Sequence, residues 1–305
     1  MCKNIHQRGV TMKFLVHFIN GISLGSIYAI IALGYTMVYG IAKMLNFAHG
    51  DVIMVGAFTV YTIVFGSLGV NPLVGVLLSI LICATLGIVI EKVAYKPLRN
   101  ASPLAVLITA IGVSYLLQNL ALLIFGADTK SFTSVITIPS LELANGQLVI
   151  TGVTMVTIIA CIVIMVALSL FIKKTKIGVA MLAVSEDKGA AQLMGIDVNK
   201  TISITFAIGS GLAAIAGVLL CSAYPSLSPY TGSMPGIKAF VAAVFGGIGS
   251  IPGAFIGGIL LGIIENLSKA YISTQLSDAI VFIVLIIVLL LKPTGILGKK
   301  IHEKV

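Results

Sequence analysis

Long apolar runs, separated by short polar stretches, dominate the chain. Several of them reach or exceed about 20 residues, the length that an α-helix needs to span the hydrocarbon of a membrane. A transmembrane β-barrel would instead show alternating segments of about 10 residues, so this class is excluded. The pattern predicts an all-α, polytopic membrane helical bundle of about eight to nine membrane segments. The apolar runs are Phe14–Gly40, Val52–Phe65, Leu73–Ile90, Pro103–Phe125, Val153–Ile172, Thr201–Ser222, Ile237–Phe245, Gly253–Ile264 and Ala279–Leu291.

Composition agrees with this pattern. Of the 305 residues, 58% are hydrophobic and only 10% are charged, which is too apolar for a soluble domain. The net charge of +9 lies largely in a few loops and in the C-terminal tail, so it indicates membrane orientation and not nucleic-acid binding. The cysteines lack metal-ligand spacing and predict neither a metal site nor a disulfide framework; they are Cys2, Cys83, Cys161 and Cys221.

Basic loops predict which polar segments face the cytoplasm. The loop with Lys92, Lys96 and Arg99, the segment Lys173–Lys200 and the tail from 292 to 305 are expected inside. The stretch from 126 to 152 has little positive charge and is expected outside. If the first three apolar runs each cross the membrane once, these assignments place the N-terminus outside. A re-entrant break at Ile41–Asp51 would change the number of crossings, so the side of the N-terminus stays open. Residues 1–12 form a polar tail, with either Met1 or Met12 as the true start, and residues 13–291 form the membrane domain.

The segment Lys173–Lys200 is the longest polar stretch between two strongly apolar runs. Ser185 is expected to cap a short helix that has Glu186 and Asp187 in its first turn and ends at Gly195. Its apolar positions suit docking to a soluble partner. The alternative is an ordinary positive-inside loop with an interfacial helix.

A second polar stretch, Leu45–Asp51, interrupts the apolar pattern near the N-terminus. His49 and Asp51 are costly in lipid, so they should face protein or water. One interpretation is a broken helix at the translocation route or its gate, formed by Asn46, Phe47, His49, Gly50 and Asp51. The other is a polar turn at the membrane surface, with Asp51 capping the next helix.

A third stretch, Phe245–Gly262, is rich in glycine. Gly253 with Gly257, and Gly258 with Gly262, have the spacing of tightly packed membrane helices, within one subunit or against a second. Gly246, Gly247 and Gly249 require a tight turn. No Lys-Ser or Lys-Thr follows these glycines, so they are not a P-loop.

Enzyme signals are weak. The chain has four histidines. They form no HExxH motif, and the sequence offers no recognisable Ser, His and Asp set for catalysis. Acidic residues that could relay protons lie at or near the ends of apolar runs. We therefore expect neither catalysis nor a cofactor bound by this chain.

Four motifs in order carry a family resemblance: INGISLGSIYAIIALGYTMVYGI (19–41), LNFAHGD (45–51), KTKIGVAMLAVSEDKGAAQLMGID (174–197) and FGGIGSIPGAFIGG (245–258). Together they resemble the permease subunit of a bacterial branched-chain amino acid ABC transporter of the LivH type, over nearly the whole chain from about Lys13. The resemblance implies a type II-like ABC importer permease in the bacterial inner membrane.

The resemblance also implies partners and site residues. A second homologous permease would complete the pore, two cytoplasmic ATPase subunits would dock and use ATP, and a periplasmic binding protein would deliver leucine, isoleucine or valine. The cytoplasmic motif of the family is matched by Thr175, Gly178, Ala183, Asp187, Ala191, Gly195 and Ile196. The broken-helix motif is matched by Asn46, Phe47, Gly50 and Asp51, and the late glycine motif by Gly246, Gly247, Gly249, Ser250 and Gly253.

One departure from the family pattern concerns charge. Relatives often carry basic residues where this chain has Val179 and Leu182. Three alternatives stay open at this point: an importer of the same type for urea, short amides or other amino acids, a secondary transporter, and a membrane-embedded enzyme.

Overall fold

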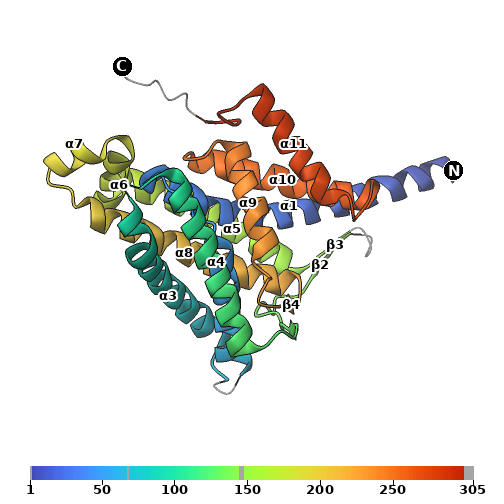
Figure 1. Cartoon of the computed structure of the whole chain (residues 1–305). Helices are drawn as coiled ribbons and strands as arrows, with labels where there is room; N and C mark the ends of the chain where they lie inside the picture. Colours follow the sequence, from blue (N-terminus) through green and yellow to red (C-terminus); the bar gives the residue numbers. More distant parts are fainter. Residues whose placement is uncertain (1, 67–68, 100, 144–147, 299–305) are drawn as a thin grey trace.

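The computed structural model describes residues 2–66, 69–99, 101–143 and 148–298, with side chains from Met12 onward. This part of the chain forms eleven α-helices and four very short strands (Figure 1). The prediction of an all-α membrane bundle is confirmed. Six helices are long and apolar enough to cross a membrane: α1 (Cys2–Ala42), α3 (Pro72–Ile90), α4 (Pro103–Phe125), α5 (Gly152–Lys174), α8 (Val198–Ala223) and α10 (Ile251–Tyr271).

Three shorter apolar helices lie among the long ones. They are α2 (His49–Val60), which continues as a π-helical turn (Tyr61–Phe65), α9 (Ser233–Gly246) and α11 (Ser277–Leu291). Both α9 and α10 are longer than the apolar runs that predicted them. Helix α9 can begin at Ser233 although it contains Pro235. This proline lies in the first turn, where a backbone amide has no partner within the helix and its absence costs little.

The polar segments gather at two opposite ends of the bundle (Figure 1). One end holds α6 (Lys176–Glu186), α7 (Lys188–Leu193), a π-helical turn (Glu91–Tyr95) and a 3-10 turn (Lys96–Leu98). The other end holds the strands. There β1 (Lys130–Ser131) pairs with β4 (Ser226–Leu227), and β2 (Leu141–Leu143) pairs with β3 (Leu148–Ile150).

The positions of the loops and termini show which segments lie at the same end of the bundle. The basic loop after α3 and the α6–α7 segment share one end, as expected for cytoplasmic segments. The N-terminal end of α1 lies at the opposite end, where the ring of Phe14 is 6.4 Å from that of Tyr271. Helix α1 starts at Cys2, so it continues through most of the segment predicted as an N-terminal tail. The described part of the C-terminal tail returns to the first end, because the amide of Ile296 donates to the Phe245 carbonyl.

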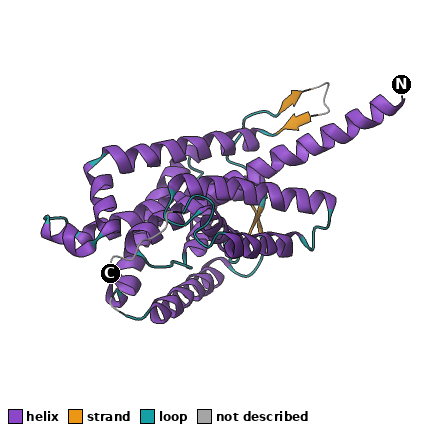
Figure 2. Ribbon diagram, turned by 90° about the horizontal axis from the view of Figure 1, so that it is seen from above, coloured by secondary structure: helices purple, strands orange, loops and turns teal. Residues whose placement is uncertain are grey.

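Of the six long helices, α1 and α8 are the most deeply buried. Figure 2 shows the helices packed against one another, with the N-terminal end of α1 projecting from the bundle. The outer helices α3, α4 and α5 expose many large apolar side chains, such as Leu73, Leu123 and Ile159. Such a surface is stable against lipid or another membrane subunit and not against water.

Backbone contact between α1 and α10 is very close, and glycine makes it possible. A Cβ atom added at Gly262 would lie 2.1 Å from the Gly25 nitrogen, and one at Gly258 would lie 2.4 Å from the Ala29 Cα. Gly257 and Gly253 pack in the same way against α9 near Gly246. The structure thus places both glycine pairs of the sequence at contacts within the subunit.

We predict that Gly262→Ala destabilises the protein by about 1–3 kcal/mol. The new methyl group would clash with the main chain of α1 at Gly25, which cannot move aside as a flexible side chain could. Thermal unfolding in detergent measures the change. Gly112→Ala on α4 is the matched control. Its added Cβ would meet no atom within 4 Å, so stability should stay constant or rise by up to about 1 kcal/mol. Equal effects of the two substitutions would contradict this packing.

Candidate functional site

The segment Lys173–Lys200 folds as two helices and not as one. Thr175 caps α6, and its Oγ1 accepts a hydrogen bond from the Gly178 amide at 3.0 Å. Asp187 adopts an extended backbone and caps α7 by accepting from the Ala190 amide at 2.9 Å. The prediction that Ser185 is the cap was wrong. Ser185 lies in the last turn of α6 and donates to the Leu182 carbonyl, because the stronger Asp187 cap restarts the helix two residues later.

Glu186 and Asp187 consequently have different places from those predicted. Glu186 is the last residue of α6 and Asp187 is the cap itself, so neither lies in the first turn of a helix. Ala183 is half-buried, and its carbonyl accepts from the Asp187 amide. Gly178 lies at the corner between α5 and α6, where an added Cβ would be 2.3 Å from the Phe171 carbonyl oxygen.

The end of α7 is sharply defined. Gly195 has φ of +82°, the left-handed conformation that glycine adopts without strain. Its amide donates to the Gln192 carbonyl, and the Ile196 amide donates to the Ala191 carbonyl. These two bonds are a Schellman motif, as expected for a terminating glycine after a helix.

The apolar positions of α7 divide between two directions. Ala191 is buried against the core of the bundle, whereas Leu193 is 90% exposed and Met194 is 82% exposed. The buried Ala191 holds α7 against the bundle, and the exposed side chains of Leu193 and Met194 are free to contact another protein.

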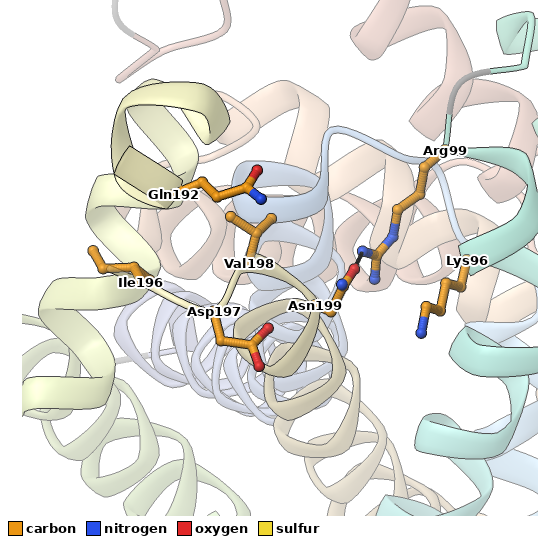
Figure 3. A pocket seen from close by; sticks show the side chains of 7 residues that line it. All are labelled: Lys96, Arg99, Gln192, Ile196, Asp197, Val198 and Asn199. Carbon is orange, nitrogen blue, oxygen red and sulfur yellow. Dashed lines mark hydrogen bonds between the residues drawn. The ribbon is translucent and has the colours of Figure 1, made fainter. Parts of the chain in front are cut away.

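A groove of about 520 Å³ opens beside α7, and its lining side chains are shown in Figure 3. One wall is the 3-10 turn with Arg99 behind it, and the other is the chain leading into α8. The lining is mainly polar, with residues Lys96, Arg99, Gln192, Ile196, Asp197, Val198 and Asn199.

A buried acid lies directly behind this groove. The Glu91 side chain is fully buried, accepts from Ser203 Oγ at 2.6 Å and pairs with the Arg99 guanidinium. Arg99 also donates to Asn199 (Figure 3). These contacts tie the C-terminal end of α3 to the first turns of α8. Sequence reasoning did not find this network, since Glu91, Arg99, Asn199 and Ser203 come from two segments far apart along the chain.

Lys188 joins α7 to the end of α1. Its Nζ donates to the Ala42 carbonyl at 3.0 Å, one of the carbonyls that the end of a helix leaves without a partner. Partial burial lowers the pKa of Lys188, and the nearby Arg99 and Lys43 cations lower it further. The negative end of the α1 dipole offsets this crowding of cations.

Helix α1 ends here, and the chain is interrupted before α2 begins. Lys43 has φ of +58°, which ends the regular helix. Asn46 is buried and accepts from the Tyr95 hydroxyl at 2.9 Å. Phe47 packs against Phe240 on α9, with ring centroids 5.4 Å apart. The interruption begins at the exposed Lys43, and from Met44 onward it is buried or partly buried in the protein.

The first turn of α2 is buried as well. The His49 ring lies 4.6 Å from that of Tyr35, and both of its nitrogens lack a hydrogen-bond partner among the described residues. Gly50 packs on α9, because an added Cβ would lie 2.8 Å from the Gly232 carbonyl oxygen. Asp51 does not cap α2. It is 2% exposed and accepts from Gln118 Nε2 at 2.9 Å.

The late glycine motif forms the turn between α9 and α10. Gly247 and Gly249 have φ of +106° and +93°, conformations that glycine readily adopts. Ser250 caps α10 by accepting from the Gly253 amide. Gly249 lies against Gly40 near the end of α1, so this turn adjoins the interruption.

A second buried ionic cluster lies nearer the opposite end of the bundle. Lys238 of α9 pairs with Glu265 of α10 at 2.8 Å and with Asp278 of α11 at 2.7 Å. Glu265 also accepts from Lys269 and from the Tyr28 hydroxyl. Sequence analysis did not single out Lys238, which falls within an apolar run. No cluster of His, Cys, Asp and Glu able to hold a metal occurs in the described part of the chain.

Interrupted membrane helices and a capped helical segment at the basic end are the features of a transport permease. The chain belongs to the family described as "Branched-chain amino acid transport system / permease component", whose model matches residues 17–289. It is a multi-pass membrane protein.

Curated relatives agree with this family. The chain is 46% identical to the high-affinity branched-chain amino acid transport system permease protein LivH of Escherichia coli K12, over 96% of this chain and 98% of that protein. It is 41% identical to BraD of Pseudomonas aeruginosa, over the same shares. It is 30% identical to a probable LivH of Methanocaldococcus jannaschii, over 90% of this chain and 89% of that protein.

One solved structure also resembles the chain. It is PsaBC from Streptococcus pneumoniae in complex with Fab, with a TM-score of 0.47 and 15% sequence identity. The match covers 90% of this chain and 91% of that chain.

We predict that Arg99→Met destabilises the protein by about 3 kcal/mol or more, because it leaves the Glu91 carboxylate buried without its cation. Thermal unfolding in detergent measures the effect. The double variant Glu91→Gln with Arg99→Met should recover much of the loss, since the buried charge is then gone.

Lys96→Met is the matched control for this prediction. It removes an exposed cation from the same groove and should change stability by no more than about 0.5 kcal/mol. A double variant as unstable as Arg99→Met alone would show that the Glu91 charge is not the cause.

Proposed function

We propose that this chain is the permease subunit of an ATP-binding cassette importer and forms part of the translocation pathway for leucine, isoleucine and valine across the bacterial inner membrane. The names of the curated relatives and the family description support the substrate class. The chain itself binds no cofactor in this proposal. Separate ATPase subunits bind and hydrolyse ATP, and a periplasmic binding protein delivers the substrate to the end that holds the strands.

The observation that carries the proposal is the exposed apolar end of α7. Leu193 and Met194 are exposed to 90% and 82% at the basic end of the bundle. Lipid does not reach them if this end faces the cytoplasm, and exposed apolar pairs of this kind mark protein–protein contacts. A soluble ATPase subunit would cover them.

Two connections would carry a movement of α7 into the membrane. The first is its attachment to α5 and α8, the long helices on either side of the cytoplasmic segment. The second is the bond between Lys188 and the Ala42 carbonyl, which leads to the interruption at residues 43–48. ATP-driven closure of the ATPases would shift α7 and, through these contacts, exchange inward-facing and outward-facing states.

A second, homologous permease would complete the pore. The apolar surfaces of α3, α4 and α5 leave room for such a subunit as well as for lipid. Gly50 and Asp51 of α2 and the first turn of α9 meet inside the bundle, and irregular backbone at this depth is tolerated where it lines a pathway.

Purification of the tagged chain from its native membrane in a mild detergent tests the proposal. We expect two P-loop ATPase subunits and a second permease to be recovered with it. Leu193→Ser combined with Met194→Ser should reduce ATPase recovery roughly tenfold, because it removes two exposed apolar contacts. The second permease should still be recovered.

Ile177→Ser is the matched control for this experiment. Ile177 is an exposed apolar residue of α6, so unchanged recovery of the ATPases in this variant would place the contact on α7. Recovery of the wild-type chain alone, with leucine transport in liposomes, would contradict the proposal and favour a secondary transporter.

We predict that Lys188→Met uncouples ATP hydrolysis from transport, because α7 loses its bond to the end of α1. In proteoliposomes, leucine uptake per ATP hydrolysed should fall several-fold, while ATPase recovery in the purification stays unchanged. Lys176→Met removes an exposed cation from α6 and serves as the control. An unchanged ratio of uptake to hydrolysis in Lys188→Met would show that this link does not transmit the movement.

A further inference from the structure

We propose that the Asp51 carboxylate pairs with the ammonium group of the amino acid as it passes through the cavity between α2, α4 and α9. This inference rests on the proposed function and deepens it. It names the part of the substrate that the membrane subunit itself recognises.

The cavity has the size and composition for a small amphiphilic ligand. Its volume is about 290 Å³, near the low end of the roughly 300–1,000 Å³ of small-molecule sites. Phe47, Ile111 and Ile237 provide apolar walls. Asp51, Gln118 and Ser233 provide the polar part of the lining.

The charge of Asp51 is not balanced by the described part of the chain. Its carboxylate accepts from the Gln118 amide at 2.9 Å, and Gln118 also reaches Ser114 and Ser233 at 3.3 Å. These partners are neutral, and no described Lys, Arg or His forms an ion pair with Asp51. Burying a carboxylate without a cation is energetically unfavourable, and a primary ammonium group in the cavity would provide the missing opposite charge.

Other buried acids of the bundle show the contrast. Glu91 is paired with Arg99, and Glu265 is paired with Lys238 and Lys269. Those two side chains do not line the cavity, whereas Asp51 does. Asp51 is thus the buried acid that lines the cavity, and it has no cationic partner among the described residues. This combination points to a cation on a bound ligand and not to one that belongs to the fold.

The remaining parts of an amino acid also find suitable surroundings. The first turn of α9 lines the same cavity through Ser233 and Gly236, and a helix N-terminus within a membrane attracts a carboxylate. The apolar walls accept a branched side chain. Asp51 supplies the missing contact, which is the one to the ammonium group.

Charge-selective labelling tests the inference without requiring transport. Ser114→Cys places a thiol on the cavity wall, in a background with Cys2→Ser. The chain without Ser114→Cys reports labelling of Cys83, Cys161 and Cys221, which are buried. A cationic methanethiosulfonate should react faster than an anionic one. Asp51→Asn should reduce that preference roughly tenfold, because the charge beside the thiol is lost.

Asp128→Asn is the matched control, because it removes an equal charge from an exposed position outside the cavity. It should leave the preference for the cationic reagent unchanged. Leucine should protect the thiol, whereas 4-methylpentanoate, which has the same side chain and carboxylate but no ammonium group, should not. Equal protection by both compounds, or protection by leucine that survives Asp51→Asn, would overturn the inference.

Transport separates this inference from the proposed function. In proteoliposomes with the ATPases, the second permease and the binding protein, Asp51→Asn should lower leucine uptake about tenfold or more, while ATP hydrolysis continues. If the wild-type assembly carries no leucine, the proposed substrate is wrong, and the labelling experiment still tests Asp51. If the wild type carries leucine and Asp51→Asn carries it equally well, the role assigned to Asp51 is wrong.

Discussion

Close backbone contact along α1 is the constraint on which the rest of the structure depends. Glycines at positions 21, 25, 258 and 262 let α1 and α10 approach until their main chains touch. This contact fixes the middle of α1 against α10, and the position of the helix end at Ala42 follows from it. The interruption that follows, the buried first turn of α2 and the carbonyl that receives Lys188 all take their positions from that end.

Buried charge is arranged in two different ways in this bundle. Toward each end, acids and bases from different helices pair, so that the ions hold neighbouring helices together. Near the middle, Asp51 lies among neutral hydrogen-bonding groups beside a cavity. Paired ions lower the cost of burying each charge, and an acid without a cation keeps that cost. A membrane protein therefore has reason to keep such an acid only where a ligand can reach it.

Much of this fold could be predicted from the sequence, because a run of about 20 apolar residues is itself the signal of a membrane helix. The break before His49, the terminating role of Gly195 and the shared end of the basic loops all follow from local composition. The prediction that Ser185 caps the helix was wrong. Ser185 and Asp187 can both cap a helix, and the local sequence does not show that the fold uses Asp187. The Glu91–Arg99 and Lys238–Glu265 pairs could not be predicted, since they depend on which helices become neighbours.

The cluster around Lys238 has a consequence for the mechanics of the bundle. One ammonium group holds carboxylates from both α10 and α11 while belonging to α9. Lys238 and Glu265 are almost fully buried, so separating α9 from α10 would leave buried charges without this pairing. The consequence is that α9 and α10 are coupled by charge as well as by close packing, and α11 is joined to them by one further ion pair.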